Sequence, residues 1–226
     1  MKLSTLLACP TVQTYPLTAI IDSALCIGAG GSAGTLADKP IVRNAEGRLI
    51  IPGSHLKGRL RHECEKIARG LGWAVSRSPK PSDMVGHYRT PTHNESPHCL
   101  ISEIFGDASL PSCLIVDDLI CIIPPSELPH EVIRPGVTLN RRRRTAEDQK
   151  LYFLETSPAN LQLKFTGEIH LVNPPVYATA LICAGLQHIH ALGGSKSAGL
   201  GWLTWQRPLN IPIAEGAWTV LGGASS

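Results

Sequence analysis

Residues 49–69 have the sequence LIIPGSHLKGRLRHECEKIAR, and this stretch contains the clearest structural pattern in the chain. The apolar run at residues 49–51 predicts a short buried strand. The Pro52-Gly53 pair predicts a turn, because proline presets one turn angle and glycine tolerates the other. Apolar side chains then recur at the spacing of one helix face, namely Leu56, Leu60, Cys64, Ile67 and Ala68. The stretch therefore predicts a strand, a turn and an amphipathic helix.

The polar side of this helix carries Ser54, Lys57 and Arg61, which are three and four residues apart and so share a face. Ser54 occupies the position expected for a helix N-cap. Lys57 would then be the third helical residue, where an acid is favoured, since the first turn exposes N–H groups and the positive end of the helix dipole. A lysine is well placed there if an anion docks on the helix end. The alternative is a solvated basic helix end without a ligand.

The composition is that of a globular protein with a modest positive charge. The chain has 226 residues, which suits one elaborated domain or two small ones, with 43% apolar and 17% charged residues. A net charge of +3 permits nucleic-acid binding without requiring it. No apolar run is long enough to span a bilayer, and the patch that ends at Cys9 is shorter than a normal signal core. Seven scattered cysteines fit reduced thiols, so we expect a cytoplasmic protein without a membrane partner.

The remaining elements complete an α+β pattern. Apolar residues predict strands at 17–27, with an irregularity at Asp22-Ser23, and at 114–123, with a kink at Asp117-Asp118. Further elements are a strand at 160–172, a helix over 178–192 that stops at Gly193-Gly194, and a strand at 202–205. The order strand, helix, strands, strand, helix, strand is the βαββαβ pattern of a ferredoxin-like (RRM-like) domain.

Three segments resemble elements of one protein family. Residues 51–61, IPGSHLKGRLR, resemble the IPGSSLKGxLR motif of the RAMP superfamily, the subunits of CRISPR RNA-guided complexes. Residues 192–202, LGGSKSAGLGW, resemble the family's C-terminal glycine-rich loop, LGGxxxxGxG followed by an aromatic residue. Residues 102–107, SEIFGD, resemble its xLFG element. Because the two glycine-bounded signatures occur in the expected order, the chain is identified as a RAMP member over residues 17–205.

The resemblance implies a single RAMP domain over residues 1–226, with a ferredoxin-like core and two insertions. The expected parts are a core at about 17–71, 100–123 and 150–207, a lid insertion at 72–99, a thumb at 124–149, and a tail at 208–226 that the resemblance does not explain. The aromatic sheet motif of standard RRM modules is absent, and only 5% of residues are aromatic. We therefore expect RNA to be bound through its backbone rather than by stacking on the sheet.

The thumb contains the most basic part of the chain. Residues 137–141, VTLNR, resemble a family element written xVxIDR, with Asn140 where Asp is commoner, and residues 150–155, KLYFLE, predict a following strand. In the family this protrusion inserts into the guide–target duplex and splays bases. Arginine suits that role, because its planar group pairs with phosphate and stacks on a displaced base. An ordinary solvated charge run is the alternative.

The resemblance implies a guide-RNA-binding backbone subunit of a type III CRISPR effector complex. Glycine lets an RNA backbone approach the main chain closely, serine can donate to phosphate, and lysine adds charge. A bare glycine hairpin is the alternative for the C-terminal loop. The expected RNA-binding residues are Ser54, Lys57, Arg61, Gly193, Gly194, Ser195, Lys196, Ser197, Gly199, Arg141, Arg142, Arg143 and Arg144. We expect the two glycine-bounded segments to form one cradle, with Lys57 and Lys196 on a shared groove.

Asp38 is the expected catalytic residue. It precedes Lys39-Pro40-Ile41, and target-cleaving type III backbone subunits have an Asp before a polar-Pro-Val/Ile tripeptide at this place. The resemblance implies cleavage of target RNA with the help of a divalent ion, Mg²⁺ or Mn²⁺. The implied partners are guide CRISPR RNA, target RNA, other effector subunits of the same superfamily and a large signature subunit. A turn-forming aspartate is the alternative.

The lid segment is rich in proline and histidine, and a structural zinc ion is one reason for such a long irregular insertion. Relatives carry zinc-binding cysteines here, whereas this chain has Ser102 at one of the expected positions. The candidate ligands are Cys64, His87, His93, His98 and Cys99. The alternative is a polar loop with unliganded histidines. The Asp117-Asp118 pair could bind a metal ion only if further oxygens converge on it, so a turn is the favoured reading.

Three other functions remain open. The chain could be a non-catalytic structural subunit of the same complex. It could be a standalone RAMP endoribonuclease that processes guide precursor and uses His62, His87, His93 or His98 for acid–base chemistry. It could also be a nucleotide-binding enzyme that uses the glycine run at residues 28–34, although no Gly-Lys-Ser/Thr follows.

Overall fold

The computed structural model describes residues 10–28, 37–77, 80 and 83–223. Its main layer is a six-stranded sheet in the order β2-β4-β7-β1-β8, with β3 also pairing β7. The named strand pairs of this sheet are antiparallel. The strands are β1 (Val12–Ile21), β2 (Ile50–Ile51), β3 (Leu114–Val116), β4 (Leu119–Cys121), β7 (Leu163–Val172) and β8 (Leu203–Trp205).

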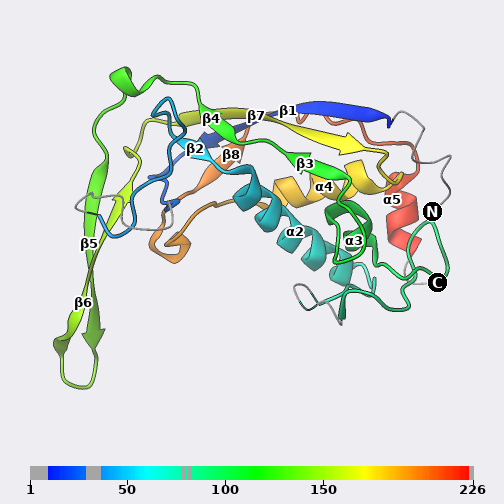
Figure 1. The fold of residues 1–226 in the computed structure, drawn as a ribbon, viewed down its shortest axis with the longest axis horizontal. Coiled ribbons are helices and arrows are strands. Elements are labelled where there is room, and N and C mark those ends of the chain that lie inside the picture. The colour runs from blue at the N-terminus through cyan, green and yellow to red at the C-terminus, as the bar shows by residue number, and fades with distance from the viewer. Residues whose placement is uncertain (1–9, 29–36, 78–79, 81–82, 224–226) are drawn as a thin grey trace.

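Two long helices cover one face of this sheet. They are α2 (Gly53–Gly70) and α4 (Ala178–His188), and both lie on the same side of the sheet in Figure 1. If β3 and β4 are taken as one interrupted strand and the two-residue β2 as an additional edge strand, the order of the remaining elements of this layer in the chain and in the sheet is that of the βαββαβ ferredoxin-like fold. The predicted α+β class is therefore confirmed.

Alternation of side chains along the central strands places the core between the sheet and the helices. On β1, Leu17, Ala19 and Ile21 are buried, and their neighbours on the strand are more exposed. The apolar face of α2 packs against this layer through a row of fully buried residues, namely Leu56, Leu60, Cys64 and Ala68. At Gly185 of α4, a Cβ atom would lie 2.6 Å from the Cys64 Sγ, so the absence of a side chain lets the two helices approach.

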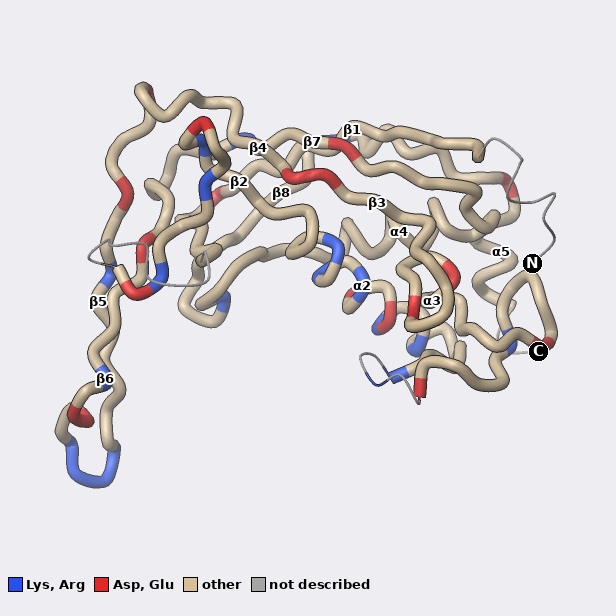
Figure 2. Tube along the Cα trace, viewed as in Figure 1, with Lys and Arg blue, Asp and Glu red and all other residues tan. Residues whose placement is uncertain are grey.

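A separate two-stranded hairpin extends from one end of the molecule (Figure 1). It consists of β5 (Val132–Asn140) and β6 (Thr145–Thr156), and its tip carries Arg141, Arg142, Arg143 and Arg144 (Figure 2). The strand predicted at 150–155 is present, but it belongs to this hairpin and not to the core sheet. The reason is its pairing with β5, in which Leu151 lies opposite Val137 and Tyr152 opposite Gly136.

Several predicted boundaries were wrong. The first strand starts earlier, at Val12, and ends at Ile21, just before the irregularity expected at Asp22-Ser23. The Asp22 N–H still donates to the Trp202 carbonyl, and the Asp22 carboxylate accepts the Thr204 hydroxyl. The strand predicted at 114–123 is divided into β3 and β4 at Asp117-Asp118, where the kink was expected. The helix predicted over 178–192 ends at His188, because Ala191 and Leu192 pair with Trp202 and Gly201.

Shorter elements occupy the insertion and the C-terminal segment. Helix α3 (Leu100–Phe105) follows the irregular insertion, η2 (Pro125–Glu127) precedes the hairpin, and η3 (Lys196–Ala198) lies in the glycine-rich loop. Helix α5 (Ala217–Gly222) packs near the start of the insertion, where Trp73 Nε1 donates to the Leu221 carbonyl at 2.7 Å. None of the described helices is both long enough and apolar enough to cross a bilayer.

Candidate nucleic-acid interface

A cavity of about 480 Å³ lies where the hairpin meets the core domain. Five segments that are distant in sequence meet there: the chain that follows β1, the loop before β2, the first turn of α2, strand β6 of the hairpin, and the glycine-rich loop after α4. Its walls are formed by Cys26, Ile27, Gly28, Asp38, Lys39, His55, Leu154, Gly193, Gly194 and Ser195. The predicted catalytic residue and the start of the predicted RNA-binding loop are thus brought together.

Backbone packing explains two glycines of the C-terminal signature. Gly193 has φ +88°, and a Cβ there would lie 2.4 Å from the Cys26 carbonyl oxygen. Gly201 has φ +72°, and a Cβ there would lie 1.8 Å from the Leu192 carbonyl oxygen. The Gly194 N–H donates to the Cys26 carbonyl at 2.7 Å, which ties the loop to the chain after β1. Both glycines are therefore required by the fold, whatever ligand the loop binds.

The outer part of the same loop is exposed beside the cavity. Gly194, Ser195, Lys196, Ser197 and Gly199 all reach solvent, whereas Gly193 is buried. Lys196 Nζ donates to the Gly193 carbonyl at 3.0 Å, so the lysine charge is held over the loop. Five of the six predicted RNA-binding residues of this loop are therefore accessible to a ligand, and Gly193 is not.

His55 is the cavity residue that sequence reasoning missed. Its Nε2 accepts the Gly193 N–H at 3.0 Å, so it connects the first turn of α2 to the glycine-rich loop. Burial, followed by the nearby charges of Lys196 and Arg59, lowers the pKa of His55 and favours the neutral ring. The sequence feature that could have indicated this role is the position of His55 directly after the predicted N-cap, between the polar and apolar faces of the helix. Its partner lies 138 residues away, so periodicity could not identify it.

Lys57 and Arg61 have protein partners instead of lining the cavity. Lys57 Nζ donates to Ser112 Oγ and to the Leu114 carbonyl, both at 2.8 Å, and burial lowers the pKa of this lysine. Arg61 donates to Glu65 and to the Gly106 carbonyl. The first turn of α2 therefore contacts the glycine-rich loop through His55. The cavity is not the predicted groove shared by Lys57 and Lys196, because neither lysine lines it.

The predicted N-cap was also wrong. The helix begins at Gly53, the Ser54 side chain is exposed and makes no capping hydrogen bond, and Asp118 Oδ1 accepts the Gly53 N–H at 2.7 Å. The acid that complements the helix dipole thus comes from the connection between β3 and β4. Lys57 becomes the fifth helical residue and lies beyond the first turn. Its position is therefore no longer evidence for an anion bound at the start of the helix.

Asp38 is fixed at the cavity wall by the hairpin. Its N–H donates to the Phe153 carbonyl at 3.0 Å, and its Oδ2 accepts the Phe153 N–H at 2.8 Å. Lys39 continues this contact, since its carbonyl accepts the Glu155 N–H at 3.2 Å. The loop therefore extends the edge of β6, and the exposed Asp38 carboxylate faces the same cavity as the glycine-rich loop.

The other cavity residues define its chemistry only in part. Burial raises the pKa of the Cys26 thiol, which disfavours a thiolate nucleophile. Gly28 lines the wall, but the rest of the glycine run, residues 29–34, lies outside the described residues. The reading of that run as a phosphate loop therefore stays a prediction.

The predicted zinc ligands do not converge in the described part of the chain. Cys64 is buried in the core with its Sγ 3.5 Å from the Leu181 carbonyl oxygen. Cys99 lies beside Ser76 and Ser102, and His98 Nδ1 lies 2.7 Å from the Asp107 carboxylate. Within the described ranges, one group brings three metal-binding side chains together, and it consists of Asp117, Glu168 and His170. The described residues therefore give the predicted zinc ligand set no geometric support, and it stays a prediction.

The hydrogen bond between His55 and Gly193 leads to a prediction about pH. Because folding lowers the pKa of His55, the unfolded chain takes up a proton first as the pH falls. The contribution of this contact to stability should be complete above about pH 6.5, the value for a free histidine, and should decrease below it. Chemical unfolding at pH 8 and pH 5 should show a larger loss of stability for the wild type than for His55→Gln, whose amide oxygen can accept the Gly193 N–H without titrating.

Hydrogen exchange of the Gly193 amide provides a second readout. After correction for the intrinsic pH dependence of the exchange rate, exchange should accelerate at low pH more in the wild type than in His55→Gln. The control variant is His87→Gln, because His87 is exposed in the insertion. It should retain the pH response of the wild type. Equal responses in the wild type and His55→Gln would contradict the assignment.

Comparison with known proteins gives one family. A family model described as the RAMP superfamily matches residues 19–204, which is most of the chain and includes both long helices, the hairpin, the cavity and all of the sheet except most of β1 and the last residue of β8. No curated protein matches the chain.

Proposed function

Because the chain belongs to the RAMP superfamily, we propose that it is a guide-RNA-binding backbone subunit of a type III CRISPR effector complex that cleaves target RNA paired to the guide. RAMP proteins have CRISPR-associated RNA-binding functions, and some of them are endoribonucleases. The proposed partners are guide RNA, target RNA, other superfamily subunits and a large signature subunit. The observation that carries the proposal is the cavity that joins Asp38, His55 and the glycine-rich loop.

The guide would pass over the glycine-rich loop. Ser195, Lys196 and Ser197 are exposed there and offer hydroxyl and ammonium donors to phosphate oxygens. Gly199 has φ +81°, and no atom lies within 4 Å of the position that a Cβ would occupy, so its backbone is open to a close ligand. His55 supports the loop from below through the Gly193 N–H. This surface suits the sugar–phosphate chain better than the bases, since the described cavity residues include no Phe, Tyr or Trp, and the one ring among them, that of His55, accepts the Gly193 N–H.

The target strand would lie between this loop and the hairpin. RNA carries its own nucleophile, the 2′-hydroxyl, so the protein needs to place one nucleotide in line and to arrange charge around its phosphate. Asp38 is suited to accept the 2′-hydroxyl proton, because the Phe153 N–H holds one of its carboxylate oxygens in position. Lys39 adds a positive charge at the same wall.

The family resemblance also implies a divalent ion, Mg²⁺ or Mn²⁺, at the cleavage site. The described cavity residues provide one carboxylate, that of Asp38. This fits an ion of the magnesium type, which is often held by one or two carboxylates together with water and substrate phosphate oxygens. When bound, the ion would supply Lewis-acid stabilisation of charge on the phosphate.

The test of the proposal is cleavage of labelled target RNA by the assembled complex in the presence of Mg²⁺. Loss of cutting in an Asp38 variant supports the catalytic role, and a complex that binds target without cutting it assigns the chain as a structural subunit. Guide precursor cleaved by the isolated chain without metal would instead assign a standalone endoribonuclease. The geometry disfavours this last function, since His62, His87, His93 and His98 do not line the cavity.

The arginine-rich hairpin tip leads to a prediction about salt dependence. Arg142→Gln/Arg143→Gln should leave the turn intact, because Asn140 Oδ1 accepts the backbone N–H groups of residues 142 and 143. Each arginine–phosphate pair that the variant removes should reduce the slope of log affinity against log salt by about 0.7 on single-stranded RNA. We expect a decrease of up to about 1.4 in binding titrations at several salt concentrations.

The matched control is Lys66→Gln/Arg69→Gln, which removes the same charge from the last turns of α2. These two residues pair with Glu63 and Glu65 and do not line the cavity. The control should keep the wild-type slope within error. Equal slopes for the wild type and the tip variant would mean that the hairpin arginines do not contact phosphate.

A further inference from the structure

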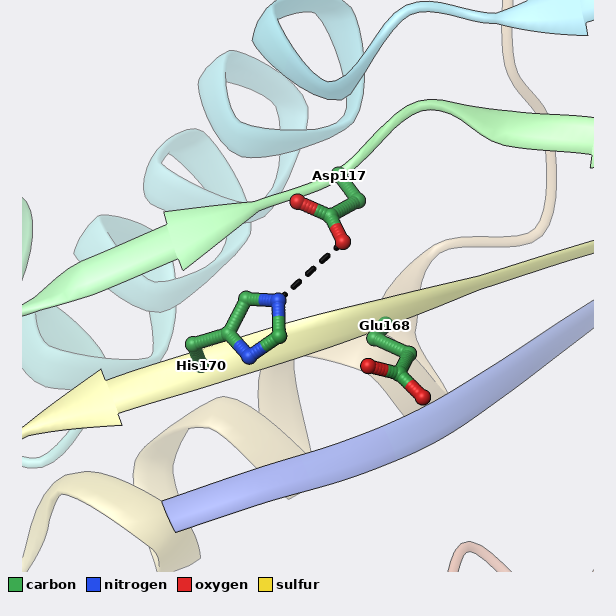
Figure 3. A group of neighbouring side chains, drawn as sticks. All are labelled: Asp117, Glu168 and His170. Carbon is green, nitrogen blue, oxygen red and sulfur yellow. Dashed lines mark hydrogen bonds and ion pairs between the residues drawn. The ribbon is translucent and has the colours of Figure 1, made fainter. Parts of the chain in front are cut away.

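We propose that Asp117, Glu168 and His170 bind one divalent transition-metal ion, zinc in preference to magnesium, on the uncovered face of the main sheet (Figure 3). The site is separate from the Asp38 cavity and shares no residue with it. It does not depend on the function proposed above, because it follows from the geometry of the sheet alone.

The sheet places the three side chains on the same face. Glu168 and His170 are two residues apart on β7, so both project away from the buried Ile169. Asp117 lies in the connection between β3 and β4, and its N–H donates to the Glu168 carbonyl at 3.0 Å. Gly167 lets this connection lie directly on β7, because a Cβ there would approach the Asp118 carbonyl oxygen to 2.8 Å. The backbone thus holds Asp117 over the β7 pair without help from the ligand side chains.

The spacing of the donor atoms suits one small ion. One atom from each side chain lies within 4.8 Å of the other two, and His170 Nε2 is 3.1 Å from Asp117 Oδ2. Zinc bonds to imidazole nitrogen and carboxylate oxygen are about 2.0–2.2 Å, so two ligands on a tetrahedral ion are about 3.4 Å apart. The histidine–aspartate distance is already close to that value. Rotation of the exposed Glu168 side chain closes the remaining gap.

A fourth residue orients the histidine. Thr14 lies directly opposite His170 in the pairing of β1 with β7, and its Oγ1 is 2.9 Å from His170 Nδ1. When Nδ1–H donates to this oxygen, the lone pair of Nε2 points at Asp117. Metal-binding histidines hold their second nitrogen in this way, and such outer contacts fix the ring and its tautomer. Thr14 is therefore a positioning residue for the proposed ion, and it comes from a strand that supplies no ligand.

The donor set decides which metal is preferred. One imidazole nitrogen with two carboxylate oxygens is a set that zinc accepts, with water in the fourth position. Mg²⁺ instead requires oxygen ligands in near-ideal octahedral geometry, and a histidine nitrogen suits it poorly. The site should therefore differ in preference from the ion implied at Asp38.

An ion at this position would also strengthen the start of α2. Asp118, the neighbour of Asp117, accepts the Gly53 N–H at 2.7 Å, and the Val116 carbonyl lies against Gly53. An ion that fixes Asp117 on β7 would therefore also fix the connection between β3 and β4, against which α2 begins. His55 of the cavity is two residues further along that helix. Zinc should accordingly raise the unfolding temperature of the full chain as well as bind to it.

The experiment is calorimetric titration of zinc chloride into the full chain after treatment with a chelator. We expect one zinc ion per chain with a micromolar or lower Kd, and no displacement by a tenfold excess of Mg²⁺. His170→Gln and Glu168→Gln should each raise the Kd at least about tenfold and abolish the zinc-dependent shift in unfolding temperature. His130→Gln is the control, since His130 is exposed on another loop, and it should bind zinc as the wild type does.

A second variant keeps the test decisive if a ligand substitution disturbs folding. Thr14→Val retains all three ligands and should weaken zinc binding about tenfold, because the ring is no longer held. Cobalt in place of zinc gives a visible spectrum that should change in Thr14→Val and disappear in His170→Gln. Unchanged zinc affinity in Thr14→Val and Glu168→Gln, or no binding by the wild type, would overturn the proposal.

Discussion

Replacing Asp38 by asparagine should reduce target RNA cleavage by the assembled complex at least about 100-fold while leaving guide and target binding unchanged. The asparagine oxygen can still accept the Phe153 N–H, so the loop should stay on β6 as it does in the wild type. The substitution removes the negative charge that, in the proposed role, would accept a proton or hold a cation beside the scissile phosphate. Single-turnover cutting of end-labelled target at saturating complex measures this effect without a contribution from binding.

The control for Asp38→Asn is Glu46→Gln, which removes one carboxylate charge from an exposed loop that does not line the cavity. It should cut at the wild-type rate. If Asp38→Asn also cuts at the wild-type rate, another residue performs the chemistry. If the wild-type complex binds target and does not cut it, the chain acts as a structural subunit.

The parts of the fold that depend on local pattern could be predicted from the sequence. The apolar row of α2 and the alternation on β7 each follow from neighbours within a few residues, and both elements form as expected. The interruption at Asp117-Asp118 was also visible, because two adjacent acids do not continue a buried strand. Helix ends were less accurate. The end of α4 depends on pairing of Leu192 with Gly201, which no local propensity contains.

The candidate site shows the same limit more strongly. Local rules for helix starts predicted Ser54 as the N-cap and Lys57 as the third helical residue. Both predictions failed because the helix begins at Gly53, whose N–H is accepted by Asp118, 65 residues further along the chain. His55 was missed because its partner belongs to the glycine-rich loop. The group of Asp117, Glu168 and His170 likewise joins β7 to the connection between β3 and β4, which sheet register places beside it. A Glu-x-His pattern on a strand places both side chains on one face, but only the topology supplies the third donor.

Replacing Gly53 by alanine should destabilise the protein by about 3 kcal/mol, which is the upper end of the usual range for overpacking. An added Cβ would lie 2.1 Å from the Val116 carbonyl oxygen and 2.9 Å from the Asp117 backbone. These atoms belong to the main chain where β3 ends, so they cannot move aside as a flexible side chain would. The helix start would have to separate from the sheet and give up its hydrogen bond to Asp118.

Gly58→Ala on the same helix is the matched control, and its effect should have the opposite sign. Gly58 is exposed, and no atom lies within 4 Å of the position that a Cβ would occupy. Alanine there should stabilise the chain by up to about 1 kcal/mol through helix propensity alone. Since propensity favours alanine at both positions, a decrease in stability at residue 53 measures the steric conflict with Val116. Chemical unfolding of both variants distinguishes two explanations for Gly53. In one, glycine is required for close packing against β3; in the other, it serves the turn that the sequence predicted. Equal and small effects would mean that the helix start can move away from β3 at little cost.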